Sequence, residues 1–262
     1  MTSVFDAAHA VDGVSPLNES GTLVVRGLRE GRVIEDGPAA AVVDLRDESL
    51  MLAVHPQHRR QGHGLRLLTR VLDEHPGLGV WAFGSLPGSA ELARAAGLTS
   101  VRTLLRMERS LADVADPPSD PRIRPYRPAD AGPIVDVNAR AFAHHPEQGR
   151  LTLEEFDTFT REPWFEPEGL LVAHDEGAVT GFHWTKRHGA GVGEVYVLAV
   201  DPAHEGHGLG RVLLAHGLAH LRRVGDTVVE LYVEASEERV VRLYEAAGFH
   251  VAARDTYHRR MS

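Results

Sequence analysis

Glycine alternates with other residues over Gly206–Gly210, and this loop points most directly to chemistry. The apolar run Glu194–Val200 before it is typical of a buried strand, and the apolar residues of Leu209–Leu221 after it recur at helical spacing. A strand, a glycine-rich loop and a helix in this order direct backbone N–H groups and the positive end of the helix at an anion such as a phosphate. The loop lacks the Gly-Lys-Ser/Thr of a Walker loop and the spacing of a dinucleotide-binding fingerprint. We therefore expect a phosphate-binding turn outside those two classes.

The same segment occurs twice in the chain. Residues 52–64 (LAVHPQHRRQGHG) align without a gap with residues 198–210 (LAVDPAHEGHGLG). Farther downstream, residues 95–98 (AAGL) match residues 246–249 (AAGF). Two matched segments in the same order indicate a duplicated domain.

Strand and helix patterns alternate in both copies, which predicts an α/β class with two tandem domains, each a mixed sheet flanked by helices. The first domain is expected over residues 1–112 and the second over residues 122–262. The proline-rich and acidic stretch at residues 113–121 is expected to be a linker. Residues 1–20 are short and polar for an opening helix, and we expect the first strands at residues 23–28 and 39–45, joined by a turn at residues 35–38.

Composition excludes several classes of protein. The formal net charge of −9 disfavours nucleic acid as a partner, because a phosphate polymer would be repelled. The absence of cysteine excludes disulfides and a thiol nucleophile. No apolar run approaches a membrane span, and residues 1–20 lack a basic segment followed by an apolar core. The histidines lie on loops without acidic partners at ligand spacing, so no metal is assigned. We expect a soluble, cytoplasmic monomer with no nucleic-acid or membrane partner.

The glycine-loop segments, together with Leu243–Phe249 (LYEAAGF), resemble the GCN5-related N-acetyltransferases. Further segments resemble a branch of that family in which one chain carries two such domains and acetylates the cysteinyl amine of cysteinyl-glucosaminyl-inositol. These are Gly181–Lys186 (GFHWTK), Gly193–Leu198 (GEVYVL) and Leu231–Glu234 (LYVE). The resemblance covers nearly the whole chain, and it implies acetyl-CoA as cofactor and this small molecule as acceptor.

The resemblance also implies that both glycine loops hold the pyrophosphate of acetyl-CoA. The strand at Leu198–Val200 is expected to splay or bulge and so to take the pantetheine arm. In the second copy Glu205 replaces a polar or basic residue and Glu237 an asparagine, and Arg211 can supply the missing charge. The expected cofactor contacts are Leu52, Ala53, Val54, Arg59, Arg60, Gln61, Gly62, His63, Gly64 and Leu65 in the first copy, and Leu198, Ala199, Val200, Glu205, Gly206, His207, Gly208, Leu209, Gly210, Arg211 and Glu237 in the second.

Three residues are expected to carry the chemistry. An α-amine with a pKa near about 8 is mostly protonated at neutral pH and must lose a proton before it attacks. A carboxylate can accept that proton, and a tyrosine can protonate the departing thiolate. The resemblance assigns these roles to Glu194 and Tyr244, and it directs the backbone N–H of Leu198 at the thioester oxygen. Loss of one such donor costs roughly 3 kcal/mol.

The first copy differs at these positions. By alignment, Glu48 stands where the second copy has Glu194, but Ala93 stands where it has Tyr244. Because a methyl group cannot protonate a thiolate, we expect the first domain to bind acetyl-CoA without catalysing transfer.

The acceptor needs partners for its charge and hydroxyl groups. By matched position, the family points to Glu19, Glu147, Lys186, Glu194 and Tyr232, and so to a cleft between the domains. Two alternatives stay open at this point: an acetyltransferase that uses another small amine, and a non-catalytic module that senses acetyl-CoA.

Overall fold

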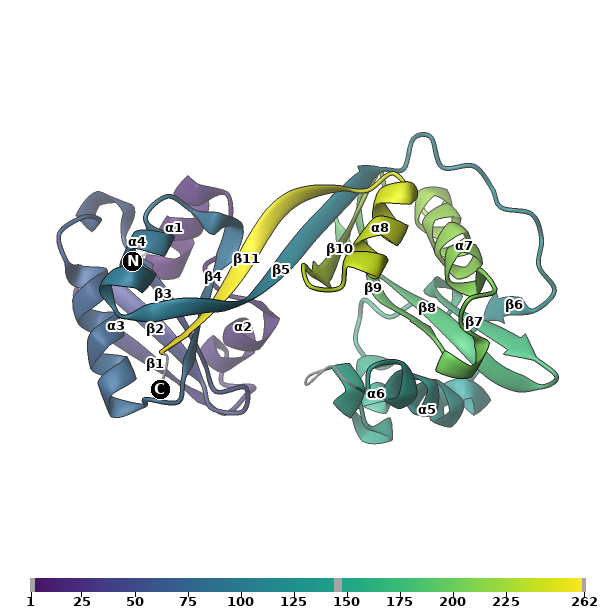
Figure 1. The fold of residues 1–262 in the computed structure, drawn as a ribbon, viewed down its shortest axis with the longest axis horizontal. Helices are drawn as coiled ribbons and strands as arrows, with labels where there is room; N and C mark the ends of the chain where they lie inside the picture. The colour runs from purple at the N-terminus through teal and green to yellow at the C-terminus, as the bar shows by residue number, and fades with distance from the viewer. Residues whose placement is uncertain (1–2, 144–147, 261–262) are drawn as a thin grey trace. The chain divides into compact units, whose positions relative to one another are not determined.

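The chain forms two compact units, and each is built from segments that are not contiguous in sequence. The computed structural model describes residues 3–143 and 148–260. The first unit comprises Met1–Arg106, Val233–Val241 and Val251–Ser262, and the second comprises Met107–Tyr232 and Arg242–His250. The C-terminal part of the chain therefore contributes segments to both units (Figure 1).

The first unit is a mixed sheet with helices packed against it. Strands β1–β3 are antiparallel, β3 and β4 are parallel, and the C-terminal strand β11 pairs antiparallel with β4. The strand order is β1-β2-β3-β4-β11-β5. Its elements are α1 (Val4–Asp12), α2 (Glu19–Val25), β1 (Gly31–Asp36), β2 (Ala39–Asp44), β3 (Ser49–Val54), α3 (His63–Glu74), β4 (Gly79–Ala82), α4 (Ser89–Ala95), β5 (Leu98–Ser110), which continues into the second unit, and β11 (His250–Arg260).

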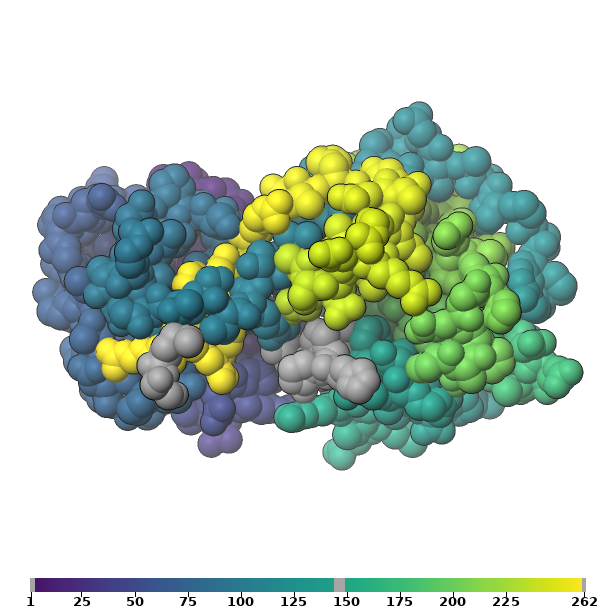
Figure 2. All heavy atoms as spheres, in the orientation of Figure 1, coloured from purple at the N-terminus to yellow at the C-terminus, as the bar shows by residue number. Residues whose placement is uncertain are grey.

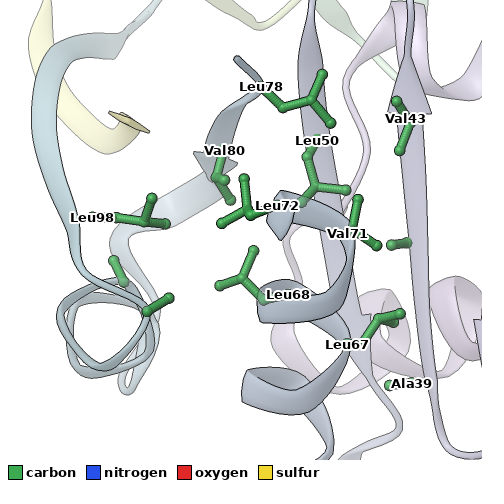
Figure 3. Close-up of a cluster of buried hydrophobic side chains, with 13 residues drawn as sticks. Ala39, Val43, Leu50, Leu67, Leu68, Val71, Leu72, Leu78, Val80 and Leu98 are labelled. Carbon is green, nitrogen blue, oxygen red and sulfur yellow. The ribbon is translucent and has the colours of Figure 1, made fainter. Parts of the chain in front are cut away.

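Helix α3 covers one face of this sheet because its apolar residues recur three and four positions apart. Leu67, Leu68 and Leu72 form one buried cluster with Leu50 of β3 and Val80 of β4 (Figure 3). This core fixes the glycine loop that precedes α3 against the end of β3.

The second unit repeats the plan with strand order β10-β9-β8-β7-β6. Its core is aromatic: Trp184 of β8 is fully buried and packs against Phe156, Trp164 and Tyr196. Its elements are β6 (Ile123–Pro125), α5 (Ala131–Ala141), α6 (Leu153–Phe159), β7 (Leu170–Asp175), β8 (Ala178–Gly189), β9 (Val192–Val200) and α7 (Leu209–Arg223). Strand β10 (Val228–Glu234) and helix α8 (Glu238–Ala246) begin or end in the first unit, which includes Val233–Val241. The α/β class predicted from the sequence is confirmed in both units. In the part of the chain that the structure describes, no helix has the length and apolar character to cross a bilayer.

Two predictions for the first forty residues are wrong. Residues 23–28 are not a strand; the first half of them belongs to α2, where the Asn18 side chain accepts a hydrogen bond from the N–H of Gly21 (2.8 Å) and so caps the helix. The polar N-terminal stretch contains α1, which starts with a reciprocal capping box between Ser3 and Asp6. The first strand of the sheet is β1.

Close packing of α7 on β8 gives a stability prediction. A Cβ on Gly217 would lie 2.1 Å from ring atoms of His183, which is fully buried and hydrogen-bonds through Nδ1 to the carbonyl oxygen of Leu213 (3.0 Å). We expect Gly217→Ala to lower the free energy of unfolding by about 1–3 kcal/mol. The matched control is Gly132→Ala in α5, where a Cβ meets nothing within 4 Å and should stabilise the helix by about 0.5–1 kcal/mol. Denaturant unfolding of both variants checks this, and equal shifts would contradict it.

Candidate active site

Strand β9 is paired on both sides at its start and on one side at its end. Its parallel pairing with β10 joins Val192–Glu194 to Val228–Glu230 and continues no farther among the described residues. Its antiparallel pairing with β8 continues to Val200. From residue 195 onward the β10 side of β9 is therefore open, and the opening expected at Leu198–Val200 is confirmed.

The register shows which backbone groups face this opening. The N–H of Asp201 donates to the carbonyl oxygen of Thr180 (2.9 Å). Thr180 and Asp201 are therefore a hydrogen-bonded pair. Because hydrogen-bonded and non-hydrogen-bonded pairs alternate along an antiparallel ladder, His183 and Leu198, three positions farther along, are a non-hydrogen-bonded pair. The N–H of Leu198 thus points away from β8, toward the side that β10 has left.

The first copy has the same backbone arrangement. Strands β3 and β4 pair at Ser49 and Leu50 and then separate. The N–H of His55 donates to the carbonyl oxygen of Pro38 (2.8 Å), so by the same alternation the N–H of Leu52 faces the open edge of β3. The two copies therefore match even in the direction of single backbone N–H groups: those of Leu52 and Leu198 both point to the open edge of their strands.

Both glycine loops take the same conformation. Gly206 and Gly208 have φ of 84° and 80°, and their counterparts Arg60 and Gly62 have φ of 62° and 84°. In the first copy a side chain thus occupies a left-handed position at a cost of roughly 1–2 kcal/mol. Helices α3 and α7 start directly after these loops, and within the described residues neither has a side-chain cap at its N-terminus. The N–H groups at such a helix start can bind an anion.

Arg59, one of the expected cofactor contacts of the first loop, is held by a carboxylate. Its two terminal nitrogens donate to the two oxygens of Asp12, each at 2.7 Å, and its Nε donates to the carbonyl oxygen of Val54 (3.1 Å). The bond to Asp12 raises the pKa of Arg59. A phosphate would therefore compete with Asp12 for this guanidinium. The counterpart in the second copy, Glu205, is exposed.

Glu194 is a buried carboxylate at the last paired position before the strands separate. Its Oε2 lies 2.6 Å from Nε2 of His188, near the end of β8. The hydrogen bond to Glu194 raises the pKa of His188, against the opposing effect of burial, and so favours the imidazolium. Lys186 lies opposite Glu194 in the β8–β9 register.

The ammonium group of Lys186 lies over two aromatic rings. Its Nζ is 4.6 Å from the ring centre of Trp164 and 4.8 Å from that of Tyr196. Tyr196 is the extra residue of a β-bulge, since Trp184 pairs with Val197 and the next residue of β8 pairs with Val195. The aromatic faces can stabilise the buried cation. His188, Trp164 and Tyr196 were not predicted as site residues; the one available signal was the period of two that places His188 on the same face of β8 as Lys186.

Tyr244 is the buried residue of a helix that is otherwise largely exposed. Figure 2 shows α8 at the surface of the visible face, and Tyr244 is 7% exposed. Its ring packs edge-on against Phe249, with 5.6 Å between centroids. Burial raises the pKa of Tyr244, so the phenol keeps its proton at neutral pH and can act as a donor.

The other predicted site residues lie in several places. Glu19 is the exposed first residue of α2, and Tyr232 of β10 is 43% exposed. Glu237 is exposed just before α8, and its N–H donates to the carbonyl oxygen of Glu234 (3.0 Å). Glu147 lies outside the described residues.

The first copy differs from the second in the surroundings of the carboxylate and in the residue that replaces the tyrosine, the two positions expected to carry the chemistry. Glu48, the counterpart of Glu194, lies exposed in the turn before β3 with φ of 46°, and Ala93 is buried in α4. Across residues 3–143 and 148–260, no group of three or more His, Asp or Glu side chains is arranged to hold a metal ion.

Comparisons with known proteins agree with this arrangement. Residues 139–249 match the model of the acetyltransferase (GNAT) family. The chain is 45% identical over 260 residues to the mycothiol acetyltransferase of Propionibacterium freudenreichii subsp. shermanii, covering 93% of this chain and 82% of that protein. It is also 45% identical over 258 residues to the mycothiol acetyltransferase of Thermomonospora curvata, covering 93% and 87%.

Solved structures share the fold. A GCN5-related N-acetyltransferase from Sphaerobacter thermophilus matches with a TM-score of 0.72 and 25% identity, over 96% of this chain and 88% of that one. A tandem GNAT protein from the clavulanic acid biosynthesis pathway matches with a TM-score of 0.64 and 20% identity, over 86% and 80%. The GNAT fold and the acetyltransferase class inferred from the sequence are confirmed, and acetyl-CoA is the cofactor of that class.

Proposed function

Since this chain belongs to the mycothiol acetyltransferase family, we propose that it transfers the acetyl group of acetyl-CoA to the cysteinyl amine of cysteinyl-glucosaminyl-inositol and so forms mycothiol. One observation carries the proposed location of the chemistry: buried Glu194 occupies the last paired position before β9 and β10 separate. A carboxylate there can meet an amine at the end of a pantetheine arm lying along the open edge. The protein is proposed to work in the cytoplasm as a monomer, without nucleic acid or membrane.

The residues present fit acetyl-CoA. The uncapped start of α7 offers backbone N–H groups for a pyrophosphate, and the open edge of β9 offers the N–H of Leu198. Arg211, in the first turn of α7, adds a positive charge. When bound, acetyl-CoA supplies an acetyl group activated as a thioester. The N–H of Leu198 is proposed to donate to the thioester oxygen and to stabilise the negative charge that develops on it.

Glu194 and Tyr244 are proposed to move the two protons of the reaction. Glu194 accepts a proton from the acceptor ammonium, directly or through a water, which frees the nitrogen lone pair for attack on the carbonyl carbon. Tyr244 donates its hydroxyl proton to the departing sulfur. Burial raises the pKa of Tyr244, which keeps the phenol protonated at neutral pH; the proton transfer itself depends on the thiolate forming within reach of the hydroxyl. The chain contains no cysteine, which favours direct attack by the amine over a thioester on the enzyme.

Acceptor recognition is proposed to involve Lys186, held over the rings of Trp164 and Tyr196 beside Glu194, and the exposed Tyr232. Glu19 and Glu147 remain proposed acceptor contacts on the resemblance alone.

The first copy, residues 1–112, is proposed to bind acetyl-CoA without turnover, and residues 122–262, after the linker 113–121, to catalyse. If the first loop binds the pyrophosphate, Asp12→Asn should raise the affinity of a second acetyl-CoA site roughly tenfold, because it frees a charge-assisted partner worth about 1.5 kcal/mol. Calorimetric titration of the full chain measures both sites. The control Asp113→Asn removes the same charge at an exposed position. An unchanged second site would contradict the competition.

A turnover assay tests the proposed reaction. Acetyl-CoA consumption is followed with cysteinyl-glucosaminyl-inositol and, at equal concentration, with cysteine and glucosamine as generic amines. The proposal expects the largest kcat/KM for the pseudo-disaccharide and acetylation at its cysteinyl nitrogen. A higher value for a generic amine would indicate an acetyltransferase of another small amine. Binding of acetyl-CoA without turnover of any amine would indicate a sensing module.

A further inference from the structure

The contact between His188 and Glu194 joins a half-exposed group to a buried one. The side chain of Glu194 is 11% exposed and that of His188 is 38% exposed, and 2.6 Å separates their Oε2 and Nε2 atoms. The two residues lie on adjacent antiparallel strands, β8 and β9, close to the β8–β9 turn. His188 lies at a register shift of β8, between Arg187, which pairs with Gly193, and Gly189, which pairs with Val192. Its side chain contacts Glu194 from this irregularity.

A base needs a fixed orientation to accept a proton from one direction. A free glutamate side chain rotates about three bonds, and ordering such a side chain costs up to about 1.5–2 kcal/mol. A hydrogen bond to Oε2 removes most of that freedom and leaves Oε1 for a substrate.

We propose that His188 is a positioning residue for the acetyl transfer: its Nε2–H donates to Oε2 of Glu194 and holds the carboxylate where it accepts the amine proton through Oε1. This inference rests on the proposed function of Glu194. It adds to that function a residue whose own atoms need not touch either substrate.

The surroundings of His188 decide the pH at which this bond is strongest. Glu194 on β9 and Glu230 on β10 favour the imidazolium, while Lys186 on its own strand and burial oppose it, and the pKa of His188 is raised on balance. A group with a raised pKa contributes its charged interaction below that pKa and loses it as the pH rises through it. The bond is charge-assisted at low pH and becomes an ordinary neutral hydrogen bond at high pH.

Two substitutions at position 188 separate positioning from packing. His188→Leu fills similar space without a donor, and we expect kcat to fall roughly 10- to 100-fold with the KM for acetyl-CoA unchanged. His188→Gln places an amide N–H near the position of Nε2 and should restore most of kcat. Because glutamine does not titrate, the ratio of wild-type to His188→Gln activity should exceed one at low pH and approach one as the pH rises through the pKa of His188.

The matched control is His250→Leu. His250 forms a looser pair with Glu108, at 3.6 Å, and its side chain is 67% exposed. Its substitution should leave kcat at the wild-type value. Circular dichroism and thermal unfolding establish that each variant is folded, and His188→Gln decides the question if His188→Leu does not fold.

Two results would overturn the inference: wild-type kcat in folded His188→Leu, or His188→Gln as slow as His188→Leu with no difference in pH profile. If one of these results is found and Glu194→Gln is nevertheless inactive, the role of His188 is refuted and the proposed function stands. Failure of the wild-type chain to acetylate cysteinyl-glucosaminyl-inositol would instead remove the proposed function.

Discussion

Replacing Glu194 by glutamine is expected to lower kcat by about 10²- to 10⁴-fold, the range usual for loss of a general base. The amide cannot accept the proton of the acceptor ammonium, but its carbonyl oxygen can still accept the hydrogen bond from His188. The buried site therefore keeps its shape, and the affinity for acetyl-CoA should not change. Steady-state kinetics with cysteinyl-glucosaminyl-inositol, together with calorimetric binding of acetyl-CoA, measures both quantities.

The control for this experiment is Glu48→Gln, the same substitution at the aligned position of the first copy. Glu48 is exposed in a turn, so full activity is expected. If Glu194→Gln kept wild-type kcat at neutral pH, the amine would lose its proton by another route. A pH profile should also show that activity of Glu194→Gln recovers in part above the pKa of the amine, where no base is needed.

Tyr244→Phe is expected to lower kcat by about 10²- to 10³-fold, because the departing sulfur loses its proton donor. The phenylalanine ring keeps the edge-on contact with Phe249, so the fold should be preserved. The affinity for acetyl-CoA should be unchanged. The measurement pairs steady-state turnover with calorimetric binding, and a sensing module would show little change in either.

Tyr257→Phe supplies the matched control. Tyr257 is a similarly buried tyrosine in the first unit, where its ring packs on Trp81 of β4. Its substitution should leave turnover unaffected. Equal losses in both variants would mean that removal of any buried hydroxyl disturbs the fold, and the assigned role of Tyr244 would then be wrong.

Local patterns predicted much of the fold. The strand before each glycine loop and the helix after it depend on residues close in sequence, and both are present in each copy. The same rules failed at residues 23–28, because Leu23, Val24 and Val25 favour a strand by their side chains while Asn18 starts a helix. The helix cap at Asn18 outweighed the strand propensity of these side chains, and a prediction based on side-chain propensity alone did not take the cap into account.

The contacts of the candidate site were less accessible from sequence. The pair of Arg59 and Asp12 joins residues 47 positions apart, and the aromatic faces around Lys186 depend on a bulge that no composition rule locates. His188 stands two residues from Lys186, but it contacts Glu194 from a register shift between Arg187 and Gly189 that the sequence pattern does not locate. Sequence therefore indicated which residue types were available, and pairing geometry decided which of them touch.

The interleaved segments of the two units limit how the copies can be studied apart. Strand β11 pairs with β4 through Thr256–His258, although it lies at the other end of the chain from the rest of the first unit. A fragment cut at residue 112 would expose the backbone edge of Val80–Ala82, which β11 covers, to solvent or to another chain, and such an edge invites aggregation. To study the first copy alone, β11 should be kept by circular permutation, which places it ahead of α1. Such a fragment is expected to fold better than one made by simple truncation.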